Sequence, residues 1–63
     1  MTQKELLYIE DAIAHEKNVI SYLNDAASNL RDEKLISYID EEIKKHESTK
    51  KKLLKKLEDN SND

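Results

Sequence analysis

Glu16 and His46 have side chains that can bind metals or transfer protons, and both stand at positions where an aliphatic residue would be expected. Each interrupts a run of apolar residues that recur at alternating spacings of three and four, which is typical of a helix face packed against another helix. If the chain folds back near residue 31, positions whose numbers add up to 62 or 63 lie opposite each other. Glu16 is therefore expected to meet His46 near the middle of a helical hairpin.

A carboxylate next to a histidine can serve two purposes. Clusters of these groups in helix bundles bind paired iron or manganese, and the same donors suit zinc, so Glu16 and His46 are candidate metal ligands. Alternatively, a buried Glu–His hydrogen bond fixes the register of the helices. We favour the structural interpretation, because Ile43 rather than a carboxylate stands three residues before His46, and Lys50 adds a positive charge one turn after it. We therefore expect no cofactor, with iron, manganese or zinc binding as the alternative.

The rest of the sequence offers little for catalysis. It has no cysteine, no glycine-rich loop and no Ser-His-Asp grouping, so covalent catalysis and phosphate binding lack their usual residues. The lysines of residues 50–56 form a basic stretch, but the chain carries a formal net charge of −3 and no aromatic residue or arginine lies among them. We expect no catalytic residue, no enzymatic activity, and no binding to nucleic acid or membranes.

The elements that position Glu16 and His46 are predicted to be two long helices. The chain has 63 residues and neither glycine nor proline, which favours an all-α fold. The facing positions, called the seam below, are Leu6, Ile9, Ile13, Glu16, Ile20, Leu23, Ala27 and Leu30 in the first helix and Ile36, Ile39, Ile43, His46, Lys50, Leu53 and Leu57 in the second. This pattern predicts an antiparallel two-helix hairpin as one domain over residues 1–58, with helices over about 3–30 and 33–58.

The ends of these helices carry local signals. Thr2 and Glu5 fit a capping box at the start of the first helix, and Asp32 is suited to cap the second. Asn29 is predicted to end the first helix in a left-handed conformation. Residues 59–63 are all polar, so we expect them to form a disordered tail.

A lone hairpin of this size buries little apolar surface. A second stripe of small apolar residues flanks the seam of the first helix, so we expect two hairpins to pair into a homodimeric four-helix bundle. The expected interface consists of Ala12, Val19, Ala26, Ile13, Ile20, Leu23, Ile39, Ile43 and Leu53. The alternative is a larger, open-ended coiled-coil assembly. Tyr8, Tyr22 and Tyr38 lie at the outer edges of the helices and are candidates for a surface that binds an unidentified protein partner.

A resemblance to a known family lies in the segment from Tyr8 to Lys17, the run Ala26-Ala27-Ser28-Asn29, the turn at Asp32 and the helix carrying His46. In these parts the chain resembles small spore-coat proteins of spore-forming Firmicutes. These proteins are relatives of the rubrerythrin and ferritin group, and the resemblance spans about residues 6 to 57. It implies a ferritin-like helical hairpin and a place in the developing spore. Ile43 stands where that group has a metal-binding glutamate, and the C-terminal segment of the longer coat proteins is missing.

A weaker similarity connects the segment Ile39-Asp40-Glu41-Glu42-Ile43 with sporulation aspartyl-phosphate phosphatases. It implies a regulator acting through Asp40, although Ile36 stands where that group has a serine. The function we expect is instead that of a non-catalytic structural or assembly protein in the cytoplasm, with a ferritin-like metal-binding bundle as the first alternative and the phosphatase-like regulator as the second.

Overall fold

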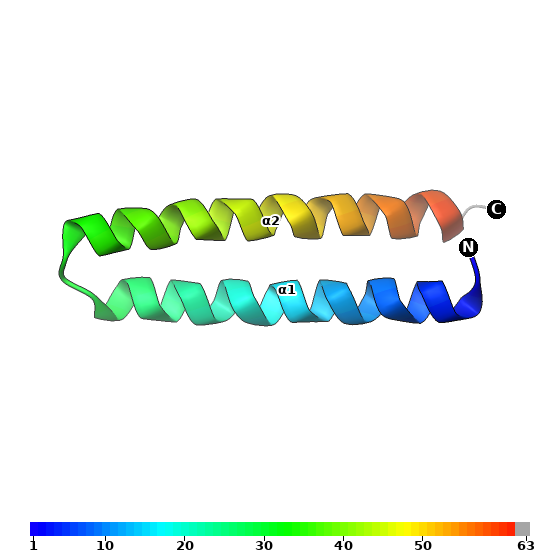
Figure 1. Cartoon of the computed structure of the whole chain (residues 1–63), viewed down its shortest axis with the longest axis horizontal. Coiled ribbons are helices and arrows are strands. Elements are labelled where there is room, and N and C mark those ends of the chain that lie inside the picture. The colour runs from blue at the N-terminus through cyan, green and yellow to red at the C-terminus, as the bar shows by residue number, and fades with distance from the viewer. Residues whose placement is uncertain (62–63) are drawn as a thin grey trace.

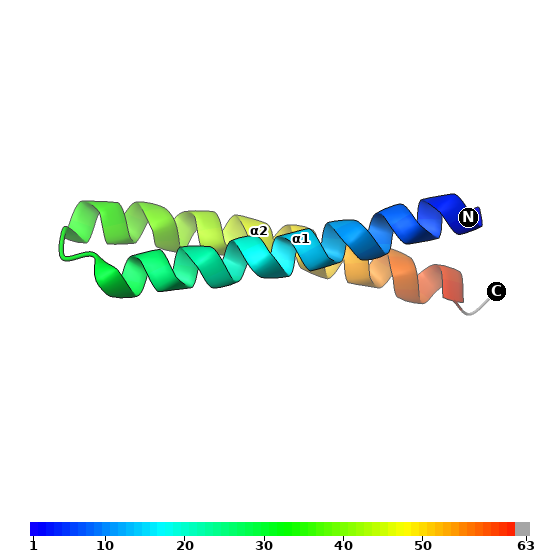
Figure 2. The same ribbon diagram turned by 90° about the horizontal axis from the view of Figure 1, so that it is seen from below.

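The computed structural model describes residues 1–61 and contains two antiparallel helices, α1 (Gln3–Asn29) and α2 (Glu33–Ser61) (Figure 1). The helices lie side by side along their whole length, and the view in Figure 2 shows that they cross at a shallow angle. The hairpin measures 47 × 14 × 11 Å. The prediction of an all-helical, two-helix hairpin is confirmed.

The start of α1 is fixed by a reciprocal pair of hydrogen bonds. The Glu5 amide donates to Thr2 Oγ1 at 3.1 Å, and the Thr2 amide donates to Glu5 Oε1 at 3.0 Å. Amides in the first turn of a helix have no partner within the helix, and this capping box satisfies two donors at once. The capping box predicted from the sequence is confirmed.

The turn between the helices uses Asp32 as a cap. Asp32 Oδ1 accepts hydrogen bonds from the Lys34 amide at 2.9 Å and the Leu35 amide at 3.2 Å, as predicted for the first residue before α2. The end of α1 differs from the prediction. Leu30 caps it in an extended conformation, with φ −99° and ψ 154°, and no non-glycine residue in the described chain has a positive φ.

The predicted left-handed Asn29 is therefore wrong. Asn29 is the last helical residue, and its side-chain Nδ2 donates to the Asp25 carbonyl at 2.8 Å. Carbonyls in the last turn of a helix lack partners along the helix backbone. The Leu30 amide donates to one of them, the Ala27 carbonyl, at 3.4 Å, without a left-handed residue.

The end of α2 also departs from the prediction. The helix continues to Ser61, so the expected helix end at residue 58 and the expected disorder of residues 59–61 are wrong. Asn60 Nδ2 donates to the Lys56 carbonyl at 2.8 Å, and no glycine or proline stops the helix earlier. Residues 62 and 63, the rest of the predicted tail, lie outside the described residues.

The core of the hairpin is a single seam between the two helices. Its two buried residues are Ile13 and Ile43, at 6% and 8% exposure, whereas the other described seam residues are half-buried. Leu35 and Leu54 are exposed at 50% and 41%. Neither helix, over the described residues, has a stretch both long and apolar enough to cross a bilayer.

Candidate functional site

The two helices bring Glu16 and His46 together, as predicted from the mirrored spacing. Glu16 Oε2 and His46 Nδ1 are 2.5 Å apart, although the residues are 30 positions apart in the sequence. The carboxylate accepts and the imidazole Nδ1 donates. The glutamate side chain is 14% exposed and the histidine side chain 32% exposed, so the carboxylate is the more deeply covered partner.

The position of the pair follows from the helical repeat. Glu16 comes one turn after Ile13, and His46 comes one turn after Ile43, which are the two most buried side chains of the described hairpin. Residues three apart on a helix lie on the same face. The hydrogen bond therefore forms beside the best-packed part of the seam, where a low local dielectric strengthens it.

One hairpin supplies few groups for a metal ion at this site. Among residues 1–61, no group of three or more His, Cys, Asp or Glu side chains is placed to hold a metal. Glu42, one turn before His46, is paired with Lys45, whose Nζ lies 3.2 Å from Glu42 Oε1. Catalytic zinc sites use three protein ligands, so a metal at Glu16 and His46 would need donors from a second copy of the chain.

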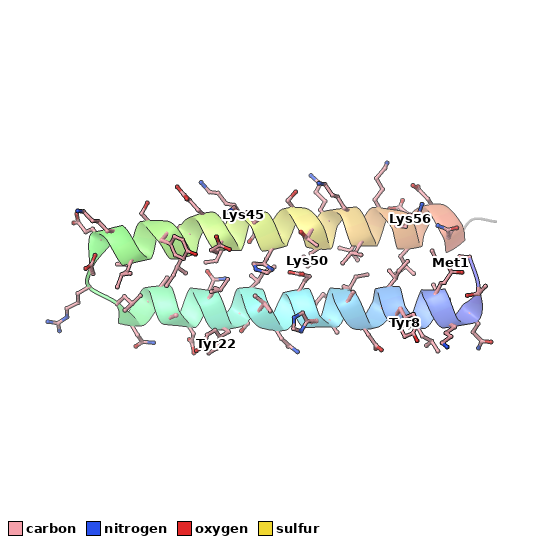
Figure 3. All side chains as sticks on the ribbon, viewed as in Figure 1. Met1, Tyr8, Tyr22, Lys45, Lys50 and Lys56 are labelled. Atoms are coloured by element: carbon pink, nitrogen blue, oxygen red, sulfur yellow. The ribbon has the colours of Figure 1, made fainter. Side chains whose placement is uncertain are left out.

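Lys50 is the other polar residue in the seam. It is half-buried and lies on the side of α2 that faces α1 (Figure 3). Its long aliphatic stem can cover apolar surface while the ammonium group reaches water. We therefore assign Lys50 a packing role at the edge of the seam.

The aromatic residues that were candidates for a partner surface are all exposed. Tyr8, Tyr22 and Tyr38 have exposures of 61%, 75% and 61%, and Figure 3 shows Tyr8 and Tyr22 on the outer side of α1. Lys4 Nζ lies 5.9 Å from the centroid of the Tyr8 ring, within the range of a cation–π contact. Asp40, the residue implied by the phosphatase similarity, is exposed on α2.

An open groove near the chain ends was not predicted as a site. It has a volume of about 670 Å³ and is lined by Leu6, Glu10, Leu54, Leu57 and Glu58. The sequence signal for it was Leu54, an apolar residue directly after the seam residue Leu53. The groove shows which residues of the two helices share a face of the hairpin.

A scan against protein-family models found no match, and neither the search of curated proteins nor the search of solved structures found a similar protein.

Proposed function

We propose that this chain is a non-catalytic structural or assembly protein that acts by self-association, with two hairpins forming a four-helix bundle. The observation that supports this function is the large surface that one hairpin leaves uncovered. Exposed apolar residues along both helices are the chemical means of association, and the assembly role agrees with the resemblance to spore-coat proteins. Residence in the developing spore is part of the same proposal.

The accessible surface area shows how much surface one hairpin leaves uncovered. The hairpin exposes 5265 Å², whereas a compact monomer of 7.4 kDa is expected to expose about 4,200 Å². The difference, roughly 1,000 Å², is comparable to the area of about 800 Å² that each partner buries in a standard protein interface. A second copy of the hairpin would cover an area of this size.

The apolar face that the second copy would cover can be identified from the groove. Glu10 and Leu54, which each follow a seam residue by one position, line the same groove and so share a face. The residues directly before Ile13, Ile20 and Ala27 on α1 and before Ile36 on α2 flank the other side of the seam, so they lie on the opposite face. This opposite face, called the dimer face below, carries the half-buried Ala12, Val19 and Ala26 on α1. On α2 it carries the exposed Leu35, the half-buried Glu42 and the exposed Lys56.

A pair of matched charge substitutions tests this proposal. Val19→Asp places a carboxylate in the middle of the dimer face and should shift the protein from dimer to monomer, with a lower melting temperature. Asn18→Asp adds the same charge on the exposed adjacent position and should leave the dimer intact. Molar mass by light scattering and melting temperature over a hundredfold dilution measure both effects. A Val19→Asp variant that stays dimeric and keeps its melting temperature would overturn the proposed interface.

A ferritin-like metal-binding bundle is the second candidate, because the hairpin brings Glu16 and His46 into contact. Two hairpins would supply two carboxylates and two imidazoles, a donor set that suits iron, manganese or zinc. Elemental analysis of protein purified without chelator or affinity tag separates the two functions. Stoichiometric metal that is lost in the Glu16→Leu, His46→Leu double variant would establish the second candidate.

A further inference from the structure

We propose that the two hairpins pair with their turns at the same end, so that α1 of each copy packs on α2 of the other. The two Glu16–His46 pairs then close into a ring in which carboxylates and imidazoles alternate. This inference rests on the proposed function, because it specifies how the dimer face of one copy meets that of the second.

Two symmetric arrangements are available to hairpins that pair through one face. A two-fold axis along the hairpin puts both turns at one end and stacks α1 on α2 of the partner subunit. A two-fold axis across the hairpin puts the turns at opposite ends and stacks α1 on α1 and α2 on α2. Glu16 is the middle residue of α1 and His46 lies next to the middle of α2, so both pairs share one level in either arrangement.

The order of groups around that level distinguishes the arrangements. With the turns at the same end, Glu16 lies between its own His46 and His46 of the partner subunit. With the turns at opposite ends, Glu16 faces Glu16 of the partner subunit, and the two imidazoles face each other. Like charges brought together away from water repel strongly, whereas alternating donors and acceptors attract. The alternating ring is therefore the favoured arrangement.

The imidazole has a nitrogen available for the second contact. Nδ1 of His46 is engaged with Glu16, and Nε2, on the other edge of the ring, has no hydrogen-bond partner among residues 1–61. No fully buried side-chain nitrogen or oxygen in the described chain lacks a partner, so solvent reaches Nε2 in the single hairpin. In the proposed dimer His46 is an imidazolium, whose Nδ1–H donates to its own Glu16 and whose Nε2–H donates to Glu16 of the partner subunit in place of solvent.

The charges and apolar groups near the ends of the dimer face agree with this order. Because Glu16 lies level with His46, turns at the same end bring Glu5 level with Lys56 of the partner subunit and Ala26 level with Leu35 of the partner subunit. An acid then meets a base, and two apolar side chains meet. With the turns at opposite ends, Glu5 lies level with Ala26 of the partner subunit and Lys56 lies level with Leu35 of the partner subunit. Each charged side chain then meets an apolar one.

One contact favours the opposite arrangement. Turns at opposite ends would bring Ala12 against Val19 of the partner subunit, whereas turns at the same end bring Val19 near Glu42 of the partner subunit. Glu42 is held by Lys45 within its own helix, so its carboxylate is already paired and its aliphatic stem can pack on Val19. This loss is small beside two carboxylates facing each other in the centre of the bundle.

A distance between spin labels tests the arrangement. The chain has no cysteine, so Arg31→Cys places a single label in the exposed turn. Turns at the same end predict a label distance within roughly 20–25 Å in the dimer, because neighbouring helices are about 8–10 Å apart and the label arms add to that spacing. Turns at opposite ends predict a distance near the 47 Å length of the hairpin. A long distance in a confirmed dimer would overturn the arrangement and leave self-association intact.

The control is Ser48→Cys, which places the label on the exposed side of α2 next to its midpoint. Both arrangements predict a distance well below 47 Å there, so this variant shows that the label reports dimers at all. The molar mass of each labelled variant is measured in the same sample. A monomeric mass for the unlabelled chain and for both variants would overturn the proposed function and the arrangement with it.

Discussion

His46 Nδ1 donates a hydrogen bond to Glu16 Oε2 and joins the middle of α2 to the middle of α1. Shifting one helix along the other by a single turn would move the two groups apart by about 5.4 Å and break the contact. The pair thus sets the register of a seam whose other positions, apart from Lys50, are aliphatic. A part-buried polar pair of this kind specifies one alignment even where it adds little stability.

The first prediction concerns the energy of this pair. His46→Leu should destabilise the protein by about 1–3 kcal/mol, because it leaves the covered Glu16 carboxylate without its partner. Glu16→Leu should also destabilise it by removing the partner of the imidazole. The double leucine variant should match or exceed the native stability, since aliphatic side chains of similar volume can replace the whole pair.

Urea unfolding at one fixed protein concentration measures these differences. His15→Leu is the matched control, because His15 is exposed on the outer side of α1 and its replacement should change the unfolding free energy by less than about 0.5 kcal/mol. A destabilisation of the double variant equal to the sum of the two single variants would mean zero coupling energy between the positions, and would contradict an energetic contact between Glu16 and His46.

The second prediction concerns the cap of α2. Asp32 Oδ1 holds two amides of the first turn, so Asp32→Ala should lower the unfolding free energy by about 0.5–2 kcal/mol. Asp32→Asn keeps an acceptor oxygen and should retain most of the native stability. A similar loss in both variants would mean that the charge near the helix start, rather than the hydrogen bonds, is what stabilises it.

The third prediction is a pH dependence at the start of α1. The Thr2 amide, and after it the Thr2 hydroxyl, hold the pKa of the Glu5 carboxyl below its ordinary value. A carboxyl whose pKa is lower in the folded state stabilises that state above its unfolded pKa, roughly 4.3, and this contribution is lost as the pH falls through the folded pKa. Glu5→Gln should therefore lose less stability than the native protein between about pH 6 and about pH 3. Identical losses in thermal unfolding would contradict this role of Glu5.

The sequence predicted those features that depend on local hydrogen-bonding groups or on strict periodicity. Thr2, Glu5 and Asp32 could be assigned because each cap involves residues only two or three positions apart. The contact between Glu16 and His46 could be assigned because seven or eight seam positions in each helix align only one way once the turn is short.

The ends of the two helices could not be predicted in the same way. Asn29 and Asn60 each donate from the side chain to a carbonyl four residues earlier. α1 ends at Asn29, close to the expected residue 30, whereas α2 continues to Ser61, past the end that the polar composition of residues 59–61 indicated. Several end conformations differ little in free energy, so composition does not decide among them. The function could not be predicted in this way either. The seam spacing that specifies a hairpin is the same whether a second copy or another partner covers the dimer face.

The molar mass of the native chain in solution tests the central claim most directly. Sedimentation equilibrium over a hundredfold range of concentration should give twice the 7.4 kDa chain mass, with monomer appearing only at the lowest concentrations. The melting temperature should rise with concentration over the same range. A mass of 7.4 kDa at every concentration, with a constant melting temperature, would contradict self-association as the function of this protein.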